Sequence, residues 1–115
     1  MVKKSLLALL MVSALAGCSD PDSEWLNNGN LNGLDRQGWA EASPAKQLGT
    51  AGFWLRSLQN KGFLNDPALT EGEAFKKNAQ LLADCLNSSI AVSSVETNYL
   101  TATCVSTMGW AADKG

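Results

Sequence analysis

The residue types that usually do chemistry in proteins are scarce in this chain. It has 11 acidic residues and three cysteines but no histidine, so the commonest general base and the commonest metal ligand are both missing. Catalysis would have to use carboxylates alone, and the sequence holds no G-x-S-x-G nucleophile motif, no P-loop and no dinucleotide-binding fingerprint. We therefore expect no enzymatic activity and no cofactor.

The first cysteine, Cys18, ends an apolar segment near the N-terminus. Two lysines precede the apolar residues 6–12, and small residues then lead to the cysteine. A positive start, an apolar core and a small-residue end are typical of an export signal. The apolar part is roughly ten residues long, whereas a stable transmembrane helix needs about 20. We therefore predict that residues 1–17 are a targeting signal.

The sequence Leu15-Ala16-Gly17-Cys18 resembles the lipobox of bacterial lipoproteins. The resemblance implies that the Cys18 thiol receives a diacylglycerol, that the signal is cut before Cys18, and that the new amine is acylated. Two or three acyl chains anchor a protein stably to a membrane, whereas one attaches it reversibly. In this family an aspartate directly after the cysteine marks retention in the inner membrane. This chain has Ser19 there, so we favour the periplasmic face of the outer membrane. Asp20 follows one place later, and the inner membrane is therefore the alternative. An ordinary secretory signal with a chance cysteine is the competing interpretation.

The length and net charge of the chain exclude a second domain and some classes of partner. Cleavage before Cys18 would leave 98 residues, the size of one small domain. That chain would carry seven basic and eleven acidic groups, a net charge of −4. Because nucleic-acid affinity comes largely from basic side chains on phosphates, we expect no nucleic-acid partner. Cys85 and Cys104 would be the only remaining soft ligands, and two thiolates do not complete a four-ligand zinc site, so no metal is expected.

The segment after Cys18 is polar and rich in turn-forming residues. Residues 19–34 are dominated by Asn, Gly, Asp and Ser, which favour turns or disorder over regular structure. We interpret residues 18–34 as a flexible lipidated tether and residues 35–115 as the folded domain. The asparagines of residues 28–33 are spaced like the start of an EF-hand loop, but Trp39 occupies the twelfth position, where calcium binding needs a glutamate.

Capping residues and hydrophobic spacing predict a small all-α domain of three or four helices. A short helical turn is expected over residues 35–42. Ser43 and Pro44 then form a strong helix start, and apolar residues recur at helical spacing until Gly62 provides a left-handed stop. Gly49 and Gly52 lie inside this helix, where each costs about 1 kcal/mol relative to alanine. Their presence indicates that another backbone packs closely there.

Two further helices are expected in the second half of the chain. Thr70 and Glu73 have the spacing of a capping box, and a broad apolar stripe follows them. Residues 90–108 are ambiguous, because their Val, Thr and Ile content also suits a strand. Ser93 and Glu96 repeat the capping-box spacing, and the apolar residues beyond them step by fours, so we favour a helix.

The two remaining cysteines are expected to form one intramolecular disulfide. The export signal would deliver Cys85 and Cys104 to an oxidising compartment. Closing a loop of about 19 residues is worth roughly 3 kcal/mol in the chain-entropy model. Buried free thiols and a redox pair are the alternatives, although redox dithiols usually have C-x-x-C spacing.

Aromatic residues off the predicted core stripes mark a candidate interface. Trp54 lies beside Phe53 at the flank of the helix after Pro44, and Arg56 follows two residues later. Partly exposed aromatics and arginines are favoured anchors at protein interfaces. The candidate interface residues are Phe53, Trp54, Arg56, Trp39 and Arg36. Alternatively, a small core simply recruits the tryptophan rings.

Together these features predict a non-enzymatic, membrane-anchored lipoprotein of the periplasm. It would reach the membrane through lipidated Cys18 and bind a protein partner, either an envelope protein or an incoming toxin, as immunity and exclusion lipoproteins do. The alternative is a structural accessory subunit of an envelope, secretion or conjugation assembly. The sequence itself does not decide between these two roles.

Overall fold

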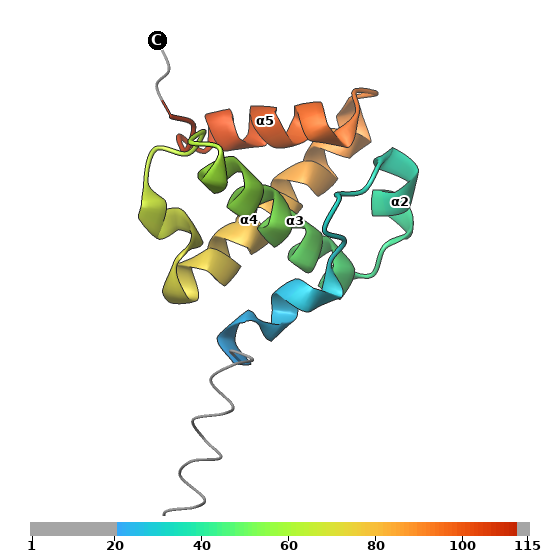
Figure 1. Ribbon diagram of the computed structural model, residues 1–115. Coiled ribbons are helices and arrows are strands. Elements are labelled where there is room, and N and C mark those ends of the chain that lie inside the picture. The colour runs from blue at the N-terminus through green and yellow to red at the C-terminus, as the bar shows by residue number, and fades with distance from the viewer. Residues whose placement is uncertain (1–20, 113–115) are drawn as a thin grey trace, which may run out of the picture.

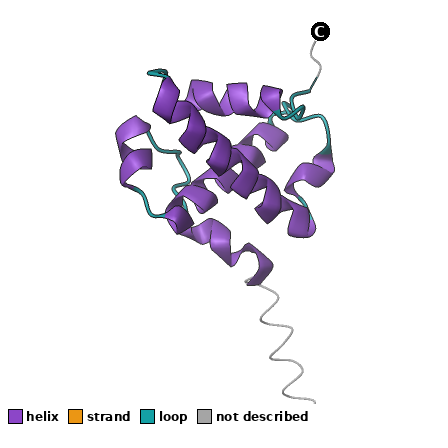
Figure 2. Cartoon of the chain, turned by 180° about the vertical axis from the view of Figure 1, so that it is seen from behind, coloured by secondary structure: helices purple, strands orange, loops and turns teal. Residues whose placement is uncertain are grey.

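A computed structural model describes residues 21–112, and these form four α-helices and two short 3-10 helices. In chain order the elements are η1 (Pro21–Asn28), α2 (Arg36–Glu41), α3 (Pro44–Asn60), η2 (Pro67–Thr70), α4 (Gly72–Val92) and α5 (Thr97–Thr107). Extended pairing within this range is limited to one isolated bridge between Leu64 and Ala111. The predicted all-α fold is confirmed, and the ambiguous residues 90–108 are helical apart from the turn between α4 and α5 (Figures 1 and 2).

Helices α3 and α4 cross in the middle of the molecule (Figure 1). α5 packs on α4, η1 packs on α3, and η2 packs on the first turns of α4. Within the described residues, η1 lies on one side of the crossing and α5 on the other (Figures 1 and 2). α3 and α5 therefore share α4 as their main support.

Local capping chemistry explains where α2 and α3 begin and end. The Asp35 side chain accepts a hydrogen bond from the Gly38 N–H at 2.7 Å, and Ser43 Oγ accepts one from the Lys46 N–H at 3.1 Å. Each cap satisfies a backbone donor that lacks a partner in the first helical turn. Gly62 adopts φ +79° directly after the C-terminal cap residue of α3. Both predicted starts and the predicted stop are confirmed.

The two predicted capping boxes are wrong. Thr70 is the last residue of η2, and Gly72 adopts φ +58°, so a right-handed helix cannot run on from Thr70. α4 begins instead after Glu71, without a side-chain cap. Ser93 Oγ accepts from the Val95 N–H at 3.2 Å, a tighter local turn that occupies its hydroxyl, and α5 starts only after Glu96.

The tether expected over residues 18–34 is too long. The predicted signal, residues 1–17, and residues 18–20, which include Cys18, lie outside the described residues, but η1 packs on α3. Leu26 is only 3% exposed, and the Trp25 ring packs edge-on against Phe75 with centroids 5.0 Å apart. The burial of Leu26 and the packing of the half-buried Trp25 stabilise η1 despite its polar neighbours.

Gly49 has the close backbone contact that was predicted, with residues 26–29 at the end of η1, whereas Gly52 is approached by side chains of η1. A Cβ atom on Gly49 would lie 2.7 Å from Gly29 Cα and 2.9 Å from the Leu26 carbonyl oxygen. A Cβ on Gly52 would lie 2.5 Å from the Trp25 ring. The missing side chains of α3 are therefore what allows η1 to dock.

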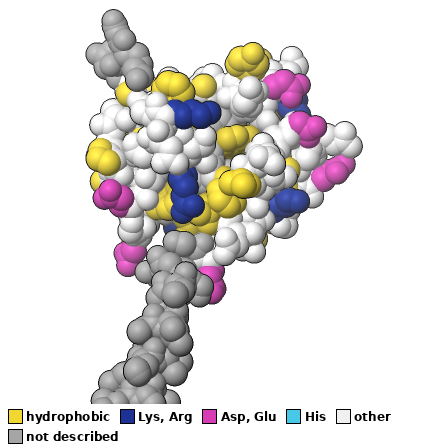
Figure 3. Space-filling view, in the orientation of Figure 1, with side chains coloured by type: hydrophobic (Ala, Val, Ile, Leu, Met, Phe, Trp, Pro, Cys, Tyr) yellow, Lys and Arg dark blue, Asp and Glu magenta, His cyan; other side chains and the backbone are white. Residues whose placement is uncertain are grey.

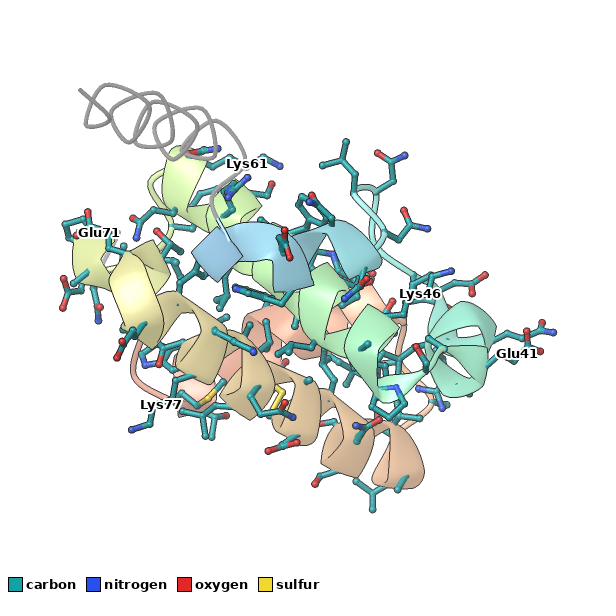
Figure 4. All side chains as sticks on the ribbon, turned by 90° about the horizontal axis from the view of Figure 1, so that it is seen from below. Glu41, Lys46, Lys61, Glu71 and Lys77 are labelled. Atoms are coloured by element: carbon teal, nitrogen blue, oxygen red, sulfur yellow. A yellow bond between two sulfur atoms is a disulfide. The ribbon has the colours of Figure 1, made fainter. Side chains whose placement is uncertain are left out.

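The disulfide between Cys85 and Cys104 joins α4 to α5 (Figure 4). The two Cα atoms are 6.0 Å apart, and Cys104 is fully buried. The predicted pairing is confirmed. Because α3 and α5 are both placed by α4, this bond fixes one side of the surface described next.

Candidate protein-binding groove

An open groove of about 360 Å³ lies between α3 and α5. It exists because both helices pack on α4 and leave a gap between their outer faces. The loop after η1 forms its rim. The groove is lined by Leu31, Asn32, Phe53, Trp54, Ser57, Leu58, Lys61, Asn98, Thr101 and Ala102.

Two neighbouring hollows share lining residues with the groove. One, of about 390 Å³, adds Arg56 and Asn60 and shares Leu31 and Phe53 with the groove. The other, of about 320 Å³, adds Asp35 and Glu96 beside Trp54. The three hollows form one continuous depression across α3 and the start of α5.

The middle of the depression is apolar. Leu31 is 73% exposed at the rim, and the Phe53 and Trp54 side chains are half-buried beside it. Figure 3 shows hydrophobic side chains gathered at the centre of this face. Leu31 and the two aromatic rings lie next to one another, and grouped exposed apolar side chains are typical of contact surfaces, so the depression is a candidate contact surface.

Trp54 is held rigidly by its neighbours. Its ring stacks on the buried Trp39 ring, with centroids 5.8 Å apart and planes 27° apart. Gly33, at φ +81°, approaches so closely that a Cβ there would lie 2.9 Å from Trp54 Nε1. The ring therefore packs against the core and also lines the groove, and its role at an interface stays a prediction.

Charge is distributed unequally along the depression. The exposed cations Arg56 and Lys61 flank one end, while the carboxylates of Asp35 and Glu96 lie at the other. The Arg56 guanidinium lies 5.7 Å from the Phe75 ring centroid, a cation–π contact that orients the side chain. Lys61 directly follows α3, whose end lies beside the end of α5 and away from the start of η1 (Figure 1).

Two of the interface candidates from the sequence, Trp39 and Arg36, do not line the depression. Trp39 is 1% exposed, and its Nε1 donates to Asn87 Oδ1 at 2.8 Å. The Arg36 guanidinium donates to the backbone carbonyls of Val95 at 2.8 Å and Ile90 at 3.3 Å. Both side chains tie α2 to the end of α4, because this short helix has few other ways to attach to the domain.

Sequence reasoning missed several groove residues. Lys61, Asn98, Thr101 and Ala102 were not candidates, because they belong to segments far apart in the chain that only the packing brings together. Leu31 was missed because its surroundings were interpreted as tether. Its one available signal was a large apolar residue inside an Asn- and Gly-rich turn.

The side chains that line the groove are of types that bind protein segments. Its lining combines aromatic and aliphatic surface with amides, hydroxyls and two cations. Among residues 21–112, no group of three or more Cys, Asp or Glu side chains is arranged to hold a metal ion, and no helix is long and apolar enough to cross a membrane. No protein-family model, curated protein or solved structure matches the chain.

Proposed function

We propose that this protein is a non-enzymatic lipoprotein that binds a protein segment in its groove. Cys18 would anchor it at the periplasmic face of the outer membrane, and its partner would be an envelope protein or an incoming toxin, as in immunity or exclusion. The lipobox-like Leu15-Ala16-Gly17-Cys18 supports the anchor. The groove supports the binding.

The observation that carries the binding proposal is that half-buried Phe53 and Trp54 lie next to exposed Leu31 in the groove. Aromatic anchors give large contact areas, and a ring already fixed by its neighbours loses little conformational entropy on binding. The stacking of Trp54 on Trp39 provides that fixation. A partner's apolar side chains would cover surface that is now exposed to water.

Charge complementarity defines the partner further. A segment lying along the depression meets Arg56 and Lys61 at one end and Asp35 and Glu96 at the other. The matching segment is amphipathic, with large apolar residues at its centre, carboxylates toward the cations and a basic residue toward the acidic end. Such complementarity mainly sets orientation and specificity.

The anchor is tested by Cys18→Ser in cells fed radiolabelled palmitate. Loss of label, retention of the uncleaved precursor and loss of stable membrane attachment are expected, because the proposed acylation and cleavage both depend on this thiol. Ser19→Ala is the matched control and should be labelled and processed normally. A Cys18→Ser protein that is processed and membrane-bound like the parent contradicts the lipoprotein assignment.

The groove is tested by photo-cross-linking in cells, with a benzophenone amino acid placed at Leu31 or at Val92. Both positions are exposed, at 73% and 85%, but Val92 lies outside the groove at the end of α4. A discrete adduct is expected from Leu31 only, and Arg56→Gln should reduce it.

A peptide copied from the cross-linked segment then provides the quantitative test. We expect it to bind the purified domain with an affinity reduced at least about thirtyfold by Leu31→Asn, the scale of an interface hot spot, and unchanged by Val92→Asn. Equal adducts from both positions, or a peptide insensitive to Leu31→Asn, would rule out the groove as the binding surface.

A further inference from the structure

The folded domain begins only two residues after the proposed lipidation site. η1 starts at Pro21, so Ser19 and Asp20 alone separate it from Cys18. η1 is fixed to α3 by the buried Leu26 and by the close approach of Gly29 to Gly49. Directly after η1, the Asn30 N–H donates to Thr50 Oγ1 at 2.9 Å, and Thr50 is fully buried.

These contacts make η1 part of the rigid domain. Displacing η1 would expose Leu26 and part of Trp25 to water. It would also break the hydrogen bond from the Asn30 N–H to the Thr50 hydroxyl. Each of these changes opposes detachment. The anchor is therefore joined to the rigid domain by a two-residue connection.

Covalent geometry sets how far the domain can stand from its anchor. Cys18 and Pro21 can be at most about 11 Å apart, whatever the conformation between them. Eight residues of 3-10 helix add about 14 Å at roughly 2 Å per residue. The three steps from Asn28 to Leu31 add at most about 11 Å, so the groove rim stays within about 40 Å of the acylated cysteine.

Resting on the lipid anchor of the proposed function, we propose that the domain stands on the bilayer with the η1 end facing the lipid headgroups. The groove then meets only partner segments that come within about 40 Å of the anchor. The end of α5 faces away from the membrane, since it lies on the opposite side of the molecule from the start of η1 (Figures 1 and 2). A partner at the membrane surface is favoured over one that remains in the surrounding solution.

The charge near the anchor indicates which lipid surface it fits. Asp20, Asp22 and Glu24 place three carboxylates within seven residues of the acylated cysteine. Anionic headgroups would repel them, whereas zwitterionic headgroups carry an amine that attracts carboxylates. Figure 4 views the molecule from the η1 side, where η1 lies over α3. The membrane-facing end is therefore suited to zwitterionic lipid.

The orientation is tested with the full acylated protein in vesicles of phosphatidylethanolamine and phosphatidylcholine that contain a headgroup-labelled acceptor lipid. A donor dye is attached through azidophenylalanine in place of Glu24, in η1, or of Thr107, at the end of α5; both are exposed. Energy transfer is expected to be at least about twofold more efficient from position 24. The matched variant carries 16 Gly and Ser residues inserted between Asp20 and Pro21, a linker with a root-mean-square length of about 20–24 Å, and should lose most of that difference.

Palmitate labelling of the same samples separates the two ways of failing. Equal transfer from both positions in a labelled protein overturns the orientation while leaving the lipid anchor intact. A difference that survives the insertion overturns the role of the short connection. Absence of palmitate and of vesicle binding overturns the proposed anchor, and this inference with it.

Discussion

Replacing Gly49 with alanine should destabilise the domain, although the same change stabilises most helices. Alanine is favoured over glycine by about 1 kcal/mol in a helix interior, and Gly49 is the sixth residue of α3. The added methyl would lie 2.7 Å from Gly29 Cα and 2.9 Å from the Leu26 carbonyl oxygen. Carbon atoms prefer separations of about 3.5–4.0 Å, so the backbone after η1 must move by about 1 Å.

The cost of that movement exceeds the gain in helix propensity. Overpacking a well-packed site costs about 1–3 kcal/mol, and partial exposure of Leu26 loses part of the roughly 1.5–3 kcal/mol that its full burial is worth. After subtracting the propensity gain, we expect a net loss of about 2 kcal/mol. For a domain of this size the melting temperature should fall by roughly 8–16 °C.

Circular dichroism melting at 222 nm of the mature chain with its disulfide intact measures this loss. Lys46→Ala and Lys46→Gly provide the matched control, because Lys46 is exposed on the same helix. There the alanine variant should be the more stable by about 0.5–1 kcal/mol. A Gly49→Ala protein that melts higher than the parent would refute the docking of η1 and restore the free tether.

Three further results are expected. Reduction of the Cys85–Cys104 bond should lower the melting temperature by about 12 °C or more, because its 19-residue separation corresponds to roughly 3 kcal/mol; two reactive thiols in the unreduced native protein would contradict the pairing. Asn87→Leu should cost about 1–3 kcal/mol in urea unfolding, because the buried Trp39 N–H loses its acceptor, and an unchanged midpoint would contradict that role. Arg36→Ala should cost about 1–2 kcal/mol and speed amide exchange at the end of α4 and in the turn before α5, where its two carbonyl acceptors lie. Rescue by lysine would argue against the two-carbonyl contact.

The helices themselves followed from local signals. The caps of α2 and α3, the left-handed Gly62 and the helical spacing of apolar residues depend on neighbours within a few positions, so the sequence alone predicted these elements. The disulfide followed from counting, since only Cys85 and Cys104 remain to pair after Cys18. The two failed capping boxes show the limit of this approach. A threonine or serine hydroxyl has several local partners, and backbone geometry, such as φ +58° at Gly72, decides among them.

The docking of η1, the burial of each tryptophan and the groove depend on contacts between segments far apart in the sequence, so only the tertiary structure decided them. Gly49 and Gly52 indicated that a backbone passes close to α3, but nothing local identified residues 21–29 as that backbone, because their composition is that of a turn. Trp39 and Trp54 differ in exposure for the same reason. Trp39 is buried in the core, whereas Trp54 is partly exposed and lines the groove. Burial and grooves arise from the relative placement of helices, and hydrophobic burial depends on the contact area made and not on sequence distance.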